Sequence, residues 1–128
     1  MAKYLGALFV LILVLVGQIF GIGGLYFQLS FLDIILHILG GLGIGLLASA
    51  LYDSGLGRSF GRRRFIFLVV LAAGLVWEGL EVNYDIARYS LWTTPYYLDT
   101  LKDLLDDIIG GALVVISLGR VPNSKDES

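Results

Sequence analysis

The chain has 128 residues, of which 57% are hydrophobic and only 16% are charged. A soluble domain of this size cannot bury so much apolar surface, so the composition indicates one integral membrane domain, residues 1–128, surrounded by membrane lipid. The net charge of −2 and the lack of a basic stripe argue against a nucleic-acid partner. The absence of cysteine excludes disulfides, thiolate metal ligands and a cysteine nucleophile.

Four apolar stretches come close to the length of a transmembrane helix, which needs roughly 20 residues to cross about 30 Å of hydrocarbon. They cover about residues 4–27, 31–52, 65–84 and 98–118, and they predict an all-α, four-helix transmembrane bundle. The first stretch has the lysine and apolar run of a signal peptide, but no small-x-small cleavage pattern follows. We therefore expect it to be retained as a span.

The uneven distribution of basic residues predicts the orientation of this bundle. The predicted inner end holds Lys3, Arg58, Arg62, Arg63, Arg64, Arg120 and Lys125. Under the positive-inside rule, both termini and the arginine-rich loop are cytoplasmic, residues 119–128 form a short cytoplasmic tail, and segments 23–30 and 85–97 face outward. The expected location is the inner or plasma membrane of a prokaryote, which the chain crosses several times.

Acidic residues gather at the predicted outer end. Eight of the eleven lie there: Asp33, Glu78, Glu81, Asp85, Asp99, Asp103, Asp106 and Asp107. Asp33 and His37 are four residues apart, so they share one face of the second helix. The same spacing relates Asp99 to Asp103, and Asp103 to Asp107, on the fourth helix. Three helices therefore bring ionisable side chains toward one end of the bundle.

An ionised aspartate near the centre of a span costs roughly 2.5–3.5 kcal/mol, and neighbouring like charges add repulsion. A divalent metal would neutralise the cluster: oxygen ligands favour magnesium, calcium or manganese, and a histidine admits zinc or iron. We predict a metal site with the ligands His37, Glu78, Glu81, Asp103 and Asp107. Asp33 and Asp106 are the predicted catalytic groups, acting as proton carriers or as hydrogen-bond partners of the ligands.

Individual residues also have ordinary structural explanations. Asp33 fits the N-terminal acid of a helix in a Ser30-x-x-Asp33 capping pattern, and His37 alone fits a hydrogen-bonded core histidine. Asp85 and Asp99 fit solvated positions at the membrane interface. The glycines of Gly41-x-x-x-Gly45 and Gly110-Gly111 indicate close helix packing rather than a phosphate-binding loop.

Three motifs follow one another along the second to fourth spans. They are Asp33-x-x-x-His37 followed by Gly40-Gly41, then Trp77-Glu78-x-x-Glu81, then Asp99-Thr-x-x-Asp103-x-x-x-Asp107-x-x-Gly110-Gly111-Ala112. Their order resembles the YjdF-like family of bacterial and archaeal membrane proteins, over about residues 31–115. They are more distantly similar to the VanZ-like proteins, although the glutamine and arginine expected after the glutamate are missing here. The resemblance implies a choice of site residues, but it implies no particular activity.

These observations predict a metal-dependent membrane protein, such as an enzyme acting on a lipid or lipid-linked substrate at the outer leaflet. Only Lys102 and Arg88 are placed to hold a phosphate group of such a substrate. One alternative is a proton or cation pathway built on the carboxylates and the histidine, which would require a homo-oligomer. The other is a non-catalytic accessory subunit whose carboxylates dock a basic partner.

Overall fold

The computed structural model of the chain describes residues 1–119, and within this range every regular element is helical. The elements are α1 (Ala2–Phe20), a π-helical turn η1 (Gly21–Leu25), α2 (Tyr26–Gln28), α3 (Leu32–Asp53), a 3₁₀ turn η2 (Arg58–Phe60), α4 (Arg62–Asn83) and α5 (Thr94–Gly119). The four long helices confirm the predicted all-α fold. Arg120 and Lys125, and with them nearly all of the predicted tail, lie outside the described residues.

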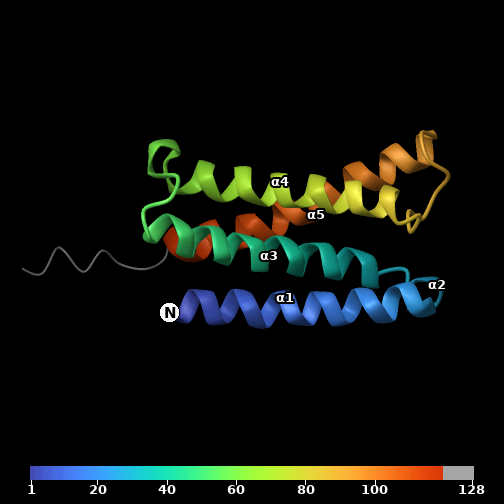
Figure 1. Cartoon of the computed structure of the whole chain (residues 1–128), viewed down its shortest axis with the longest axis horizontal. Helices are drawn as coiled ribbons and strands as arrows, with labels where there is room; N and C mark the ends of the chain where they lie inside the picture. Colours follow the sequence, from blue (N-terminus) through green and yellow to red (C-terminus); the bar gives the residue numbers. More distant parts are fainter. Residues whose placement is uncertain (120–128) are drawn as a thin grey trace, which may run out of the picture.

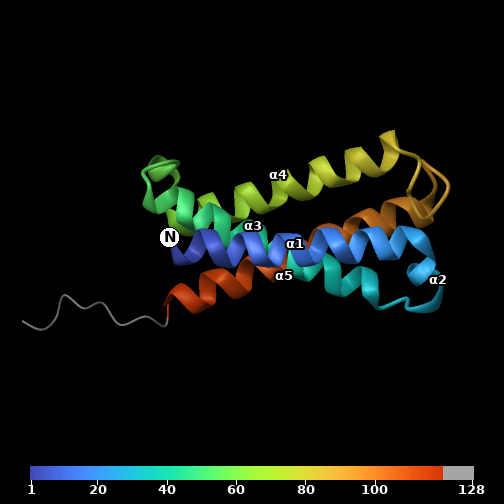
Figure 2. The same cartoon turned by 60° about the horizontal axis from the view of Figure 1, so that its bottom comes forward.

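The bundle is built around α3, the helix that contacts all three other long helices (Figures 1 and 2). Its contacts are most extensive with α5, which crosses it, and with α1, which lies along it. α4 packs on both α3 and α5, whereas α1 packs on α3 at the edge of the bundle. The N-terminus lies at the same end as the α3–α4 connection, and the α4–α5 loop lies at the other end.

Three helical segments are long and apolar enough to cross a membrane: Ala2–Leu25, Leu32–Asp53 and Arg62–Asn83. The fourth long helix, α5, has 26 residues and is therefore about 39 Å long. Five charged residues lie within its first 14 positions, and α5 is therefore not among these three apolar segments. α5 packs against α3 and α4, so three of its aspartates are buried within protein instead of facing the surroundings.

The turn between α1 and α3 differs from the capping pattern expected there. α3 begins at Leu32 without a side-chain cap, and the backbone N–H of Leu32 donates to the carbonyl of Leu29 in a tight turn. This turn moves the start of the helix beyond Ser30, so Ser30 does not cap it. Just before the turn, Gly24 has a φ of 124°, a conformation that favours glycine, and η1 closes the first helix there.

The crossing of α3 and α5 depends on two glycines that have no room for a side chain. A Cβ atom on Gly41 would lie 1.9 Å from the backbone oxygen of Asp107. A Cβ atom on Gly110 would lie 2.1 Å from the backbone oxygen of Ile38. The predicted packing role of these glycines is therefore confirmed, because any larger residue would force the two helix backbones apart.

Gly41→Ala is expected to destabilise the protein by about 1–3 kcal/mol, because the added methyl group cannot fit at the crossing. Gly79→Ala is the matched control, since nothing lies within 4 Å of its added Cβ atom. The control should stabilise the helix by up to about 1 kcal/mol. Thermal unfolding in detergent, followed by circular dichroism, measures both variants. Equal melting temperatures would contradict the assigned role of the crossing.

The predicted orientation is testable because the chain contains no cysteine. Ser59 and Ser90 are exposed at opposite ends of the bundle, in the α3–α4 and α4–α5 connections. A membrane-impermeant maleimide added to intact cells should label Ser90→Cys and leave Ser59→Cys unlabelled until the membrane is permeabilised. The reverse pattern would refute the cytoplasmic placement of the arginine-rich loop.

Candidate metal centre

Six ionisable side chains meet between α3 and α5, near the α4–α5 end of the bundle; we call them the His37 cluster. They are Asp33, His37, Lys102, Asp103, Asp106 and Asp107. Asp33 and His37 lie two turns and one turn before Gly41 on α3. Asp103 and Asp107 lie two turns and one turn before Gly110 on α5. The close crossing at these glycines therefore brings the two sets of side chains together.

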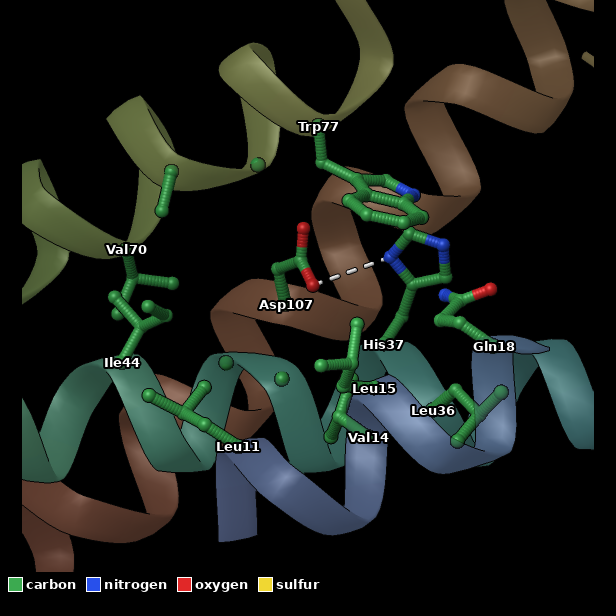
Figure 3. Close-up of a pocket in the computed structure, with 14 residues that line it drawn as sticks. Leu11, Val14, Leu15, Gln18, Leu36, His37, Ile44, Val70, Trp77 and Asp107 are labelled. Atoms are coloured by element: carbon green, nitrogen blue, oxygen red, sulfur yellow. Dashed lines mark hydrogen bonds and ion pairs between the residues drawn. The ribbon is translucent and has the colours of Figure 1, made fainter. Parts of the chain in front are cut away.

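His37 occupies the centre of this cluster and is only 4% exposed. Its Nδ1 lies 3.2 Å from Oδ1 of Asp107, the contact drawn in Figure 3. Its Nε2 lies 3.7 Å from Oδ1 of Asp33 and 3.7 Å from Oδ2 of Asp103, and it has no hydrogen-bond partner. One ring nitrogen is thus held by a carboxylate, while the other is buried, unpartnered and directed at two carboxylate oxygens.

Lys102 holds the opposite edges of the same two carboxylates. Its Nζ lies 3.0 Å from Oδ2 of Asp33, donates to Oδ1 of Asp103, and lies 3.6 Å from Oδ2 of Asp106. Asp33 and Asp103 therefore each offer one oxygen to the ammonium and the other to the imidazole. The sequence prediction treated Lys102 as a phosphate-binding candidate, whereas the structure shows it as a partner of carboxylates. Its i, i+4 spacing to Asp106 was the available signal for this role.

The two glutamates of α4 lie apart from the imidazole. Glu78 is buried and accepts a hydrogen bond of 2.8 Å from the Thr100 hydroxyl, while Glu81 accepts one of 2.7 Å from the Trp77 indole. Neither glutamate belongs to the group of potential ligand atoms around His37. Figure 2 shows the reason: α4 diverges from α3 toward this end of the bundle.

Ligand atoms of Asp33, His37 and Asp103 all lie within 4.8 Å of one another, and this trio could hold a metal ion. Metal bonds of about 2.1 Å in a tetrahedral site place neighbouring ligand atoms about 3.4 Å apart. The observed separations of 3.7 Å are close to that spacing. Of the five predicted ligands, the trio contains His37 and Asp103. Asp33, predicted as a catalytic group, is the third member of the trio. Asp107 contacts Nδ1, the ring nitrogen of His37 that is not part of the trio.

Two cavities flank the cluster. A lateral groove of about 240 Å³ lies between α1 and α4 over the surface of α3, and its lining is apolar except for Gln18, His37 and Asp107 (Figure 3). A polar chamber of about 300 Å³ lies on the other side, toward the α4–α5 loop. Asp33 and Asp103 line the chamber, so the trio stands between the two cavities.

Residues 2–124 match the family described as "Predicted membrane protein (DUF2238)". The chain belongs to this family. Its description agrees with the YjdF-like resemblance and with the three membrane-length helices, and it names no reaction. No curated protein and no solved structure matches the chain, so the similarity to VanZ-like proteins remains an expectation. This DUF2238 chain is thus a membrane protein whose chemistry has to be inferred from the His37 cluster itself.

Lys102→Gln is expected to destabilise this DUF2238 protein by about 1–3 kcal/mol, because it leaves charged, largely buried carboxylates without their ammonium partner. Arg88→Gln is the control, since its guanidinium lies 5.9 Å from the ring centroid of Tyr89 and should contribute less than about 1 kcal/mol. Thermal unfolding in detergent compares the two variants.

Combining Lys102→Gln with Asp103→Asn should cost less than the sum of the single changes, because the two side chains interact directly. Strict additivity would contradict the assignment of Lys102 as a partner of Asp103.

Proposed function

We propose that the chain is a multi-pass protein of the prokaryotic plasma membrane that binds one divalent cation through Asp33, His37 and Asp103. In this proposal the cation acts on a lipid or lipid-linked substrate. The observation that carries the proposal is the buried Nε2 of His37, which has no hydrogen-bond partner and faces two carboxylate oxygens at 3.7 Å. A buried polar atom without a partner is costly, and a metal bond would satisfy it.

The contact behind the imidazole supports metal binding. In metal sites, a histidine ligand donates its second N–H to a carboxylate or carbonyl, which fixes the tautomer and the direction of the lone pair. Asp107 stands in that position at 3.2 Å from Nδ1 of His37. A proton on Nδ1 leaves the Nε2 lone pair directed at the space between Asp33 and Asp103.

The charge of the cluster also supports a cation. The cluster holds four aspartates, three of them in contact with His37, and one lysine ammonium, which contacts Asp33, Asp103 and Asp106. A divalent ion would offset most of the charge that remains. One imidazole and two carboxylates suit zinc or manganese better than calcium or magnesium, which favour all-oxygen sites.

Three protein ligands support a catalytic rather than a purely structural ion. Structural zinc sites are closed by four protein ligands, whereas catalytic sites keep a position for water or substrate. Asp33 and Asp103 both line the polar chamber, which offers space for that additional ligand. An ion there could lower the pKa of a bound water or polarise a substrate oxygen.

The two alternative functions have less support. A proton or cation pathway would need polar groups through the other half of the bundle, but an apolar core of Ala48, Phe65, Ile66, Val70 and Val114 fills that half. An accessory subunit that docks a basic partner would need accessible carboxylates. Asp103, Asp106 and Asp107 are at most 9% exposed, so they are poorly placed to bind an external loop.

The test is the metal content of the detergent-purified protein after incubation with zinc or manganese and removal of free ion. Inductively coupled plasma mass spectrometry should find about one ion per chain. His37→Gln and Asp103→Asn should each lose it. Asp53→Asn is the matched control, because Asp53 pairs with Lys3 and Arg62 at the other end of α3 and should keep the ion.

A further variant separates a ligand from the residue that orients it. Asp107→Asn retains all three proposed ligands but weakens the acceptor behind the imidazole, so metal affinity should fall by about 10–100-fold. Competition with a metal-binding dye measures this change. Absence of metal in the unmodified protein, or equal affinity in Asp53→Asn and Asp103→Asn, would refute the proposal.

A further inference from the structure

We infer that the lateral groove and the polar chamber together bind one phospholipid with a protonated amine in its head group. Its acyl chain would lie in the groove between α1 and α4, and its ammonium among the carboxylates of the chamber. The inference rests on the proposed function in one respect: the metal ion beside the head group is the one proposed there. Lipid binding and metal binding are nevertheless separate measurements, so either proposal can fail alone.

The groove has the shape and lining of a site for an acyl chain. α1 and α4 both pack on α3 without packing extensively on each other, which leaves the space between them open (Figure 3). Its floor extends from Leu36 to Ile44 on α3, nine residues that span about 12 Å. One leaflet of a bilayer has about 15 Å of hydrocarbon, so the groove could hold most of one chain. Lipid tails surround these helices and can enter from the side.

The groove and the chamber adjoin at Gln18, beside His37. Gln18 lines both cavities, and Figure 3 places it next to the imidazole. His37 lines the groove, and the carboxylates that its Nε2 faces line the chamber. A molecule with its tail in the groove would therefore present its head group beside the trio of proposed metal ligands.

The charge of the chamber selects the head group. Five carboxylates line it, from Asp33, Glu81, Asp85, Asp99 and Asp103, and among the described lining residues Arg88 is the basic one. Even with a divalent ion bound, carboxylates outnumber cations there, which favours an ammonium group and disfavours an additional anion. Arg88 offers a guanidinium for the phosphate that precedes the amine. A zwitterionic ethanolamine phospholipid matches this arrangement.

The buried Nε2 of His37 makes the chamber more than a group of acids. This atom has no hydrogen-bond partner, belongs to a side chain that is 4% exposed, and lies 3.7 Å from oxygens of Asp33 and Asp103, which line the chamber. In the proposed function the metal ion occupies this ligand position, and the head group would lie beside the ion, in the chamber.

Two glycines provide a matched pair of variants for the groove. Gly40 lines the groove, and a Cβ atom there would make only an ordinary contact, 3.8 Å from Oδ1 of Asp107. Gly40→Leu should therefore fold and fill the groove. Gly79 has nothing within 4 Å of an added Cβ atom and lines neither cavity. Gly79→Leu makes the same substitution on the exposed face of α4.

The experiment is native mass spectrometry of the full chain in detergent, with phosphatidylethanolamine and phosphatidylglycerol of identical acyl chains. The protein should prefer the ethanolamine lipid by about tenfold, the value of one charge-assisted contact. Gly40→Leu should lower the binding of both lipids about tenfold, and Gly79→Leu should leave it unchanged. If Gly40→Leu loses its helical spectrum, Ala73→Leu fills the same groove from α4.

The double variant Asp85→Asn/Asp99→Asn tests the chamber and leaves the trio intact. Asparagine also tolerates the positive φ of 55° at position 85. The preference for phosphatidylethanolamine should disappear while metal content stays unchanged. Metal binding with equal affinity for both lipids would overturn this inference and leave the proposed function standing. A lipid preference in a protein that binds no metal would overturn the proposed function and leave this inference standing. Equal lipid binding by Gly40→Leu and Gly79→Leu would contradict the placement of the acyl chain in the groove.

Discussion

The contact on which the molecule depends is the close crossing of α3 and α5. At Gly41 and Gly110 the two backbones approach so closely that neither position can carry a Cβ atom. The crossing fixes the depth and rotation of both helices, and it sets the turn that carries His37 against the turn that carries Asp107. A side chain at either glycine would push the two helix backbones apart and would also move the ionisable groups of α3 away from those of α5. The stability of the protein and the geometry of its site therefore depend on the same close contact.

The bundle divides its interior into two unlike halves. Toward the arginine-rich end, a compact apolar core fills the space between α3, α4 and α5, and Lys3, Asp53 and Arg62 form ion pairs at its margin. Toward the other end the interior is ionisable, and Lys102 and His37 organise its carboxylates. Buried charges contribute little net stability when they are compared with a packed apolar core. Their concentration in one half is therefore better explained by binding than by folding.

The peripheral position of α1 gives this ionisable half access from the membrane. Among the long helices, α1 packs extensively only on α3, which leaves a groove between α1 and α4. This groove leads from the apolar surroundings of the helices to the imidazole of His37. From the α4–α5 loop, the polar chamber reaches Asp33 and Asp103, the carboxylates that face this imidazole. A lipid whose tail and head group lie in these two cavities would meet the proposed metal where they join. The proposed chemistry and the inferred substrate thus depend on the same arrangement of α1, α3 and α4.

The sequence alone determined the four helices, the close packing at the glycines and the membrane family, because length, hydropathy and small-residue spacing are properties of single segments. It also indicated which acidic residues share a helix face. Only the tertiary structure decided which of them meet. The divergence of α4 separates Glu78 and Glu81 from His37. The crossing of α3 and α5 brings Asp103 and Asp107 to the imidazole, and Lys102 to the carboxylate of Asp33. Helix rotation and tilt arise from packing between segments, so periodicity along one segment cannot specify them.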